Sequence, residues 1–204
     1  LDVLTMDSIL QLVESFIFYE VDKSNSKKKT LIFPRYHQRR AVSRLLEDMK
    51  TNHTDNNYLI QHSAGSGKTN TIAWLAHSLV SLHDDQNRNI VDTVLIVTDR
   101  IVVDRQLQDA VRQINHKNGV VKVMGDRETS SDLADAIAGN TKIIATTIHK
   151  FAQINQSDWM SVGNTANKKF AILIDEAHSS TTGSYMSSVS QVLTETDPEN
   201  GTID

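Results

Sequence analysis

The chain has no cysteine among its 204 residues, which excludes disulfide frameworks and thiolate metal sites. It has 2 prolines and a hydrophobic share of 39%, the composition of a folded globular domain rather than of a disordered or fibrous chain. Apolar runs of about eighteen residues, the length of a membrane span, are missing, so we expect no membrane partner. Together these absences favour a protein of the reducing cytoplasm.

A large positive charge is missing as well. The formal net charge is −4 at pH 7. Any contact with a nucleic-acid backbone would therefore depend on local basic groups rather than on the field of the whole molecule.

From residue 57 onward, short apolar runs alternate with amphipathic stretches of helical spacing. The apolar runs predict strands at 57–61, 93–98, 120–124, 142–147 and 170–174. Continuous Val/Ile/Leu runs that alternate with helices are typical of a parallel sheet buried on both faces. The sequence therefore predicts an α/β fold, a doubly wound, mainly parallel sheet with helices on both faces.

Upstream of this alternation, helical spacing predicts two helices, at about 4–17 and 38–50. The polar, lysine-rich segment 22–30 between them has no apolar face and is predicted to be a loop or linker.

The segment H-S-A-G-S-G-K-T at residues 62–69 joins the predicted strand at 57–61 to a predicted helix that begins near Lys68. Gly65 and Gly67 lack a Cβ atom, so the backbone can take positive φ and turn its N–H groups inward as a nest for phosphate oxygens. Lys68 can reach the β- and γ-phosphates of a nucleotide, and the Thr69 hydroxyl can ligate Mg²⁺. The pattern indicates a P-loop, with His62 where the usual motif has its first glycine; the alternative is a flexible Gly/Ser turn.

An acidic pair follows the last predicted strand, in the run F-A-I-L-I-D-E-A-H. We expect Asp175 to hold the magnesium ion and Glu176 to polarise the attacking water as a general base. Taken alone, the pair could also be a solvated strand end. His178 is a candidate coupling residue, with a hydrogen-bonded rim histidine as the alternative.

Five segments together resemble the motor (R) subunit of type I restriction enzymes, within the superfamily 2 helicases and translocases. They are FPRYHQ (33–38), HSAGSGKT (62–69), TDRIVVDRQ (98–106), TTIHKF (146–151) and DEAH (175–178). The resemblance implies the first RecA-like domain of an ATP-driven motor that pulls double-stranded DNA past methylase and specificity subunits. Cleavage would belong to a separate nuclease domain.

The resemblance also implies a domain plan. Residues 1–30 would be a connecting helix and linker from an upstream nuclease domain, and residues 31–204 the first RecA-like domain. A second RecA-like domain would supply arginines that contribute about 10³–10⁵ in rate. The chain alone is therefore expected to bind ATP and hydrolyse it very slowly.

Residue roles follow from the same resemblance. Gln38, with Arg35 nearby, would read the adenine edge. The expected nucleotide-binding set is Arg35, Gln38, Ser63, Ala64, Gly65, Ser66, Gly67, Lys68 and Thr69, with Lys68 and Glu176 catalytic and Thr69 and Asp175 holding Mg²⁺. The positions where the family touches the DNA backbone are Arg100, Arg105, Thr147, His149 and Lys150, for which a solvated charged rim is the alternative.

Two other functions remain open from the sequence. One is an RNA or DNA-repair helicase of the same superfamily, because DEAH does not distinguish them. The other is a module that binds nucleotide as a switch without hydrolysing it. Glu176 argues against the switch, since a pure sensor needs no carboxylate to activate water.

Overall fold

The computed structural model describes residues 5–21, 28–52, 57–63, 65–99, 103, 105–114, 120–154 and 168–176. The chain falls into two compact units, one made of residues 1–90 and 106–117 and the other of residues 91–105 and 118–204. The first unit carries the glycine loop, and the second carries the sheet with the acidic pair.

The second unit is built on a parallel sheet in the strand order β4-β5-β3-β6. Its strands are β3 (Thr93–Thr98), β4 (Val121–Val123), β5 (Ile143–Thr147) and β6 (Phe170–Asp175). Every residue of β3 and β5 is buried, which explains why their sequences are almost continuously apolar or β-branched. These four strands confirm the predictions made for 93–98, 120–124, 142–147 and 170–174.

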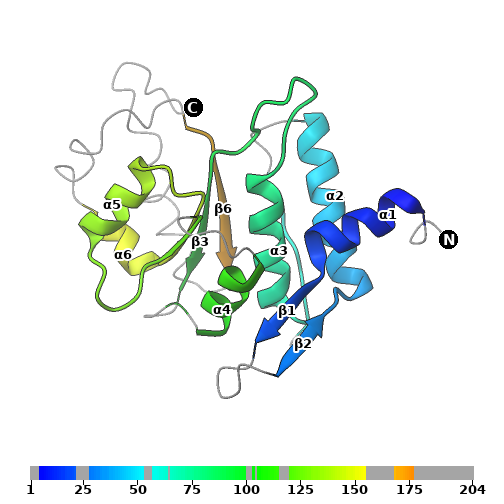
Figure 1. The fold of residues 1–204 in the computed structure, drawn as a ribbon. Helices are drawn as coiled ribbons and strands as arrows, with labels where there is room; N and C mark the ends of the chain where they lie inside the picture. The colour runs from blue at the N-terminus through cyan, green and yellow to red at the C-terminus, as the bar shows by residue number, and fades with distance from the viewer. Residues whose placement is uncertain are drawn as a thin grey trace. The chain divides into compact units, whose positions relative to one another are not determined.

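Two helices pack on one face of this sheet, α5 (Ser130–Ala138) and α6 (Ile148–Ala152) (Figure 1). Helix α5 begins with a capping box: the Thr129 hydroxyl accepts from the N–H of Asp132, whose carboxylate accepts from the N–H of Thr129. The core between helices and sheet is formed by buried apolar side chains, among them Leu95, Val97, Met124, Leu133, Ile137, Ile144, Ile148 and Phe151.

The carboxyl ends of three neighbouring strands lie in register at one edge of the sheet. Thr98 of β3 pairs with Thr147 of β5 on one side and with Asp175 of β6 on the other. In open parallel sheets ligands bind at this edge. The acidic pair therefore lies at the carboxyl end of β6, as the sequence predicts.

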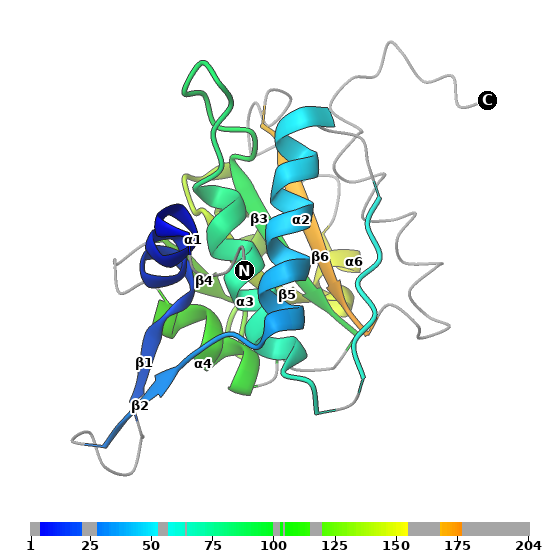
Figure 2. The same cartoon turned by 90° about the vertical axis from the view of Figure 1, so that its right-hand side faces the viewer.

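The first unit opens with α1 (Met6–Gln11), which continues into a π-helical turn, η2 (Leu12–Phe16). An antiparallel hairpin follows, β1 (Phe18–Val21) paired with β2 (Lys29–Ile32). Helix α2 (Tyr36–Asn52) packs beside α3 (Lys68–Val80) (Figure 2). Helix α4 (Arg105–Ile114) completes the unit, apart from its first residue, which is counted with the second unit.

Trp74 of α3 is the centre of the packing in the first unit. Its side chain is 1% exposed, and its Nε1–H donates to the carbonyl oxygen of Phe16 at 2.8 Å. The rings of Phe16 and Phe18 lie 5.9 and 6.0 Å from it, in tilted and edge-on arrangements. The end of the π-helical turn and the start of β1 are therefore packed onto α3 through Phe16 and Phe18.

The strand predicted at 57–61 is wrong. Residues 57–63 form no ladder with any described residue, and the side chain of Leu59 is 87% exposed. Tyr58 instead donates its hydroxyl to Asp48 Oδ2 at 2.6 Å. The apolar run here has three members between polar neighbours, too little apolar surface to specify a strand buried on both faces.

Two further differences lie near the N-terminus. The single helix predicted at 4–17 is divided into α1 and the π-helical turn, with an extended residue at Ile17. The hairpin that flanks the polar segment was not predicted, because its pairing joins two four-residue strands of which β2 begins with exposed polar residues.

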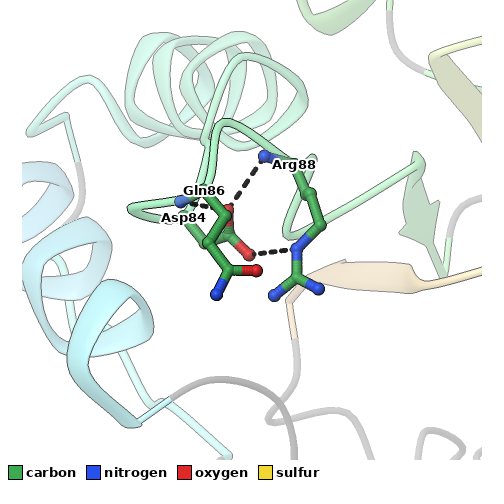
Figure 3. Close-up of polar contacts among 3 residues, drawn as sticks. All are labelled: Asp84, Gln86 and Arg88. Atoms are coloured by element: carbon green, nitrogen blue, oxygen red, sulfur yellow. Dashed lines mark hydrogen bonds and ion pairs between the residues drawn. The ribbon is translucent and has the colours of Figure 1, made fainter.

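A tight loop after α3 is organised by one carboxylate (Figure 3). Asp84 Oδ1 accepts from the backbone N–H groups of Gln86 and Arg88, both at 2.9 Å, and Oδ2 accepts from Arg88 Nε at 2.8 Å. The hydrogen bond from the Arg88 N–H is the main reason that the pKa of Asp84 is lowered. This arrangement holds Asn87 at a φ of 58°.

Candidate nucleotide-binding site

The glycine loop has the backbone conformation that the motif predicts. Gly65 has a φ of 72° and Gly67 a φ of 86°, both in the left-handed region that glycine adopts without steric cost. Gly67 is the N-cap of α3, and Lys68 is the first helical residue. Ala64 lies outside the described residues. The loop thus ends in a left-handed residue followed directly by a helix N-terminus, the arrangement of an anion-binding nest.

Three successive carbonyl oxygens of this loop accept hydrogen bonds from side chains of one short segment. Arg35 Nη1 donates to the oxygen of Gly65 at 3.4 Å, and Gln38 Nε2 donates to that of Gly67 at 2.8 Å. Between them, His37 Nε2 lies 3.3 Å from the oxygen of Ser66. The segment at the start of α2 therefore holds the carbonyl side of the loop.

These three contacts, called the clamp below, fix the orientation of the loop together with the N–H groups of Asn70 and Thr71, which also donate to the Gly67 oxygen, at 3.1 and 3.2 Å. The chain has no cis peptide among its described residues, and in a trans peptide the N–H points opposite to the preceding carbonyl. With the carbonyl oxygens of Ser66 and Gly67 turned toward the start of α2, the N–H groups of Gly67 and Lys68 are turned away from it. They face the side on which a phosphate would lie.

Gln38 is buried at 3% exposure, on the same stripe of α2 as Val42, Leu45 and Met49. Its Oε1 accepts from the backbone N–H of Arg35 at 2.8 Å while its Nε2 donates to Gly67. The amide that the resemblance assigns to adenine is therefore engaged with the loop. Its role in reading adenine stays a prediction, since each end of the amide can make one further hydrogen bond.

Asp175 and Glu176 end β6 in distinct environments. Oδ1 of Asp175 is buried, and the residue lies in register with Thr98 of β3. Glu176 has a φ of 59°, which is uncommon for a residue with a Cβ atom. The loop belongs to the first unit and the acidic pair to the second, and that they share one magnesium triphosphate stays a prediction.

The predicted DNA-contacting residues differ in exposure. Thr147 is 1% exposed, and its hydroxyl caps α6 by accepting from the N–H of Lys150 at 3.3 Å. Lys150 Nζ donates to the carbonyl oxygens of Gly125 and Glu128. His149 is exposed.

Arg105 is exposed at the first position of α4, and Arg100 and His178 lie outside the described residues. The DNA contacts of the five predicted residues and the coupling role of His178 therefore stay predictions.

The described part of the chain contains no group of three or more His, Asp or Glu side chains that could hold a metal ion. The oxygen ligands expected for Mg²⁺, the Thr69 hydroxyl and the Asp175 carboxylate, suit a hard cation that keeps several waters. None of the described helices has the length and apolar character needed to cross a membrane.

A cavity of about 220 Å³ lies at the amino ends of the strands, where β3 and β6 begin. It is lined by Asp92, Thr93, Gly139, Asn140, Lys142 and Lys168. None of the residues predicted for nucleotide chemistry lines it, so it is a feature separate from the candidate site.

The parallel sheet and the glycine loop that opens α3 are the features of a P-loop ATPase domain with an α/β fold. The chain belongs to the SWI2/SNF2 ATPase family, whose model matches residues 37–197.

Its curated relatives include a putative type I restriction enzyme endonuclease subunit (MjaVIIIP) of Methanocaldococcus jannaschii. The two are 28% identical over 207 residues, which is 94% of this chain and 20% of the relative. A type I restriction enzyme endonuclease subunit of Staphylococcus saprophyticus is 28% identical over 159 residues, 78% of this chain and 16% of the relative. These relatives confirm the resemblance to type I restriction enzymes, and the chain spans about a fifth of their length.

Among solved structures, the crystal structure of T4 UvsW matches with a TM-score of 0.58 and 17% identity, over 93% of this chain and 32% of that one. At this identity the likeness concerns the fold alone. It confirms the α/β class with a mainly parallel sheet.

Proposed function

We propose that this chain is the ATP-binding motor domain of a type I restriction enzyme, which couples ATP hydrolysis to translocation along double-stranded DNA. Methylase and specificity subunits would be its partners, and a separate nuclease domain would cut the DNA. The names of the relatives and the motif set support this assignment. They add to the family membership, which by itself supports an ATP-dependent, helicase-like enzyme.

Each residue of the proposed site has a role that follows from its chemistry. The N–H groups of Gly67 and Lys68, with the Lys68 ammonium, would bind the β- and γ-phosphates. Thr69 and Asp175 would hold Mg²⁺, which when bound neutralises the charge on the β- and γ-oxygens.

Glu176 would take a proton from the attacking water while that water's oxygen bonds to the γ-phosphorus. The bond to the bridging oxygen breaks, and ADP and inorganic phosphate are formed.

The observation that carries the proposal is the clamp on the phosphate loop. Three consecutive carbonyl oxygens are bonded from one side by the segment 35–38. A flexible Gly/Ser turn would have no need of such bonds. The clamp turns the N–H groups of Gly67 and Lys68 away from the segment 35–38, which is the orientation that an anion site needs.

Calorimetric titration of the 204-residue chain with Mg²⁺ and a non-hydrolysable ATP analogue tests the first step. We expect saturable binding, weakened about 10- to 100-fold by Lys68→Ala because a charge-assisted contact to phosphate is lost. Absence of any binding by the unsubstituted chain would rule the proposal out.

The coupling to DNA is tested separately, in the full-length protein. Double-stranded DNA should stimulate ATP hydrolysis, and displacement of a bound triplex strand should occur without separation of the duplex. Strand separation instead would favour the alternative, an RNA or DNA-repair helicase. Binding of the analogue without turnover under any condition would favour the nucleotide-sensing module.

A further inference from the structure

Position 62 is where the chain departs from the usual phosphate-loop motif, since a histidine replaces the first glycine. The imidazole of His62 lies against that of His37, with ring centroids 5.4 Å apart and planes inclined at 60°. His62 Nδ1 is 3.3 Å from the hydroxyl oxygen of Ser66, and His37 Nε2 is 3.3 Å from the carbonyl oxygen of the same residue. Ser66, which is 7% exposed, is thus held by two imidazoles, one on its side chain and one on its backbone.

The proton positions on these rings follow from their partners. A carbonyl oxygen only accepts, so His37 carries its proton on Nε2. His62 Nε2 is buried and has no hydrogen-bond partner among the described residues. A buried N–H without an acceptor costs more than a bare lone pair. The favoured tautomer of His62 therefore has its proton on Nδ1, from which it donates to the Ser66 hydroxyl.

The surroundings keep His62 neutral near pH 7. Burial, followed by the charges of His37 and Lys68, lowers the pKa of its imidazole. A neutral imidazole with one donor is the form that fits the observed contact with Ser66.

We propose that His62, backed by His37, is a positioning residue that fixes Ser66 and thereby presets the phosphate loop for nucleotide. This inference rests on the proposed function and adds a residue to its site. The loop contains two glycines, whose backbone freedom must be lost when a phosphate binds. Bonds that restrict the residue between them reduce that loss, so they act on affinity. His62 acts through Ser66, so its loss leaves the rate of the chemical step unchanged once nucleotide is bound.

The test is a double-mutant cycle between His62 and Ser66, read as the dissociation constant of a non-hydrolysable ATP analogue with Mg²⁺. His62→Ala and Ser66→Ala should each weaken binding about 3- to 10-fold, the effect of one hydrogen bond. The double variant should be no weaker than His62→Ala, because both substitutions remove the same contact. Additive losses, or no loss in His62→Ala, would overturn the proposal.

Conservative variants of His62 distinguish the effect of its hydrogen bond to Ser66 from the effect of the size of its side chain. Asparagine can place an amide N–H where Nδ1 of His62 lies, whereas glutamine reaches toward Nε2. His62→Asn should therefore bind the analogue within about 2-fold of the unsubstituted chain, and His62→Gln should resemble His62→Ala. Equal losses in His62→Asn and His62→Gln would contradict the role of the Ser66 contact.

A split of kinetic constants in the full-length protein gives a second readout. His62→Ala should raise KM for ATP and leave kcat within about 2-fold, since uniform binding alone is lost. A fall in kcat with unchanged KM would place His62 in the chemistry instead and contradict positioning. His83→Ala is the matched control, an exposed histidine of the same unit whose Nδ1 contacts the carbonyl oxygen of Ser81, and it should change neither constant.

Failure of this inference and failure of the proposed function are distinguishable in one titration series. If the unsubstituted chain does not bind the analogue, the proposed function itself fails. If it binds and Lys68→Ala binds more weakly, but His62→Ala binds as well as the unsubstituted chain, only the positioning role fails. Thermal unfolding of each variant identifies any substitution that acts by loss of folding.

Discussion

The side-chain amide of Gln38 occupies the space where a Cβ atom at Gly67 would have to lie. A Cβ built there would approach Gln38 Nε2 to 2.6 Å, while the same nitrogen donates to the Gly67 carbonyl oxygen at 2.8 Å. Glycine at 67 is therefore required twice, for its φ of 86° and for its lack of a side chain. At Gly65 the φ of 72° is the one requirement, because nothing lies within 4 Å of a Cβ built there.

Alanine substitutions at the two glycines separate these requirements. Gly65→Ala should cost about 1 kcal/mol of unfolding free energy, the strain of a left-handed alanine. Gly67→Ala should cost about 1 kcal/mol more, because it also breaks the bond to Gln38 or displaces that side chain. Urea denaturation measures both. Adding Gln38→Ala to Gly67→Ala should relieve the clash, so the two losses should be less than additive; full additivity would contradict the steric role of Gln38.

The sequence predicts the left-handed glycines because the requirement is local: a loop must turn within a few residues, and glycine alone does so without steric cost. It does not predict the clamp, because His37 and Ser66 are 29 residues apart and their contact depends on how α2 packs on α3. The signal available was weak: a polar Gln38 on the buried stripe of α2, which marks a side chain with an internal partner.

Among the strands, too, some can be predicted from their own residues, whereas others depend on contacts between distant residues. Strands β3 and β5 are buried on both faces, and such strands need apolar residues at almost every position. Their continuous apolar runs therefore predict them from the sequence. Strands β1 and β2 are largely exposed and pair with each other, and their sequences show no periodic pattern that would predict them. Tyr58–Ile60 shows the opposite error, an apolar run that the structure leaves largely exposed.

Glu176 combines a strained backbone with a proposed catalytic carboxylate. Its φ of 59° suits glycine better than glutamate. Glu176→Gly should therefore leave the unfolding free energy unchanged or raise it by up to about 1 kcal/mol. Glu176→Gln should leave stability unchanged, and in the full-length protein both variants should lower ATP turnover by about 10²-fold or more while nucleotide binding is retained. Unimpaired turnover by Glu176→Gln would show that the carboxylate is not the general base.

His77 makes the stability of the first unit depend on pH. Its Nε2–H donates to the carbonyl oxygen of Val111 at 2.7 Å, which ties α3 to α4, and burial lowers the pKa of its imidazole in spite of that bond. The folded state therefore binds fewer protons than the unfolded state below the ordinary histidine pKa of about 6.5. Its contribution is fully present above that pH and is lost as the pH falls through the lowered folded pKa.

The matched variant is His77→Gln, whose amide can still donate toward Val111 but does not titrate. Between pH 7.5 and 5 the unsubstituted chain should lose more stability than the variant, by at most about 1.4 kcal/mol per pH unit. His62, whose pKa is lowered too, is present in both proteins, so the difference isolates His77. Parallel pH profiles of the thermal midpoint would disprove the role of His77.

Lys168 closes the C-terminus of α5. Its Nζ donates to the carbonyl oxygens of Ile137, Ala138 and Gly139, which have no partner within the helix. Lys168→Met should cost about 1 kcal/mol of unfolding free energy, since charged donors near a helix C-terminus contribute about that much at partly exposed sites. Lys142→Met is the control, because the positive charge of Lys142 repels that of Lys168. Burial is the main reason that the pKa of Lys168 is lowered, and the charge of Lys142 lowers it further. It should be neutral or slightly stabilising, and equal losses in the two variants would contradict the cap.

Lys150 and His149 are neighbours at the predicted DNA-contacting segment, and they differ in exposure: Lys150 is half-buried and His149 is exposed. Lys150 Nζ donates to the carbonyl oxygens of Gly125 and Glu128, so it holds the loop after β4 against α6. Lys150→Met should therefore lower the unfolding free energy by about 1 kcal/mol. His149 is exposed, so His149→Ala should leave stability unchanged and, if the segment grips phosphates, weaken duplex DNA binding by the full-length protein.

The salt dependence of DNA binding distinguishes a role of Lys150 in binding phosphate from a role in stabilising the fold. A side chain that neutralises a phosphate lowers the slope of log affinity against log salt by about one when it is removed. We expect that change for Lys150→Met only if its ammonium leaves the carbonyl oxygens of Gly125 and Glu128 when DNA binds. A loss of stability with an unchanged slope would assign Lys150 to the fold, whereas a reduced slope with unchanged stability would assign it to DNA and contradict the internal role argued for it.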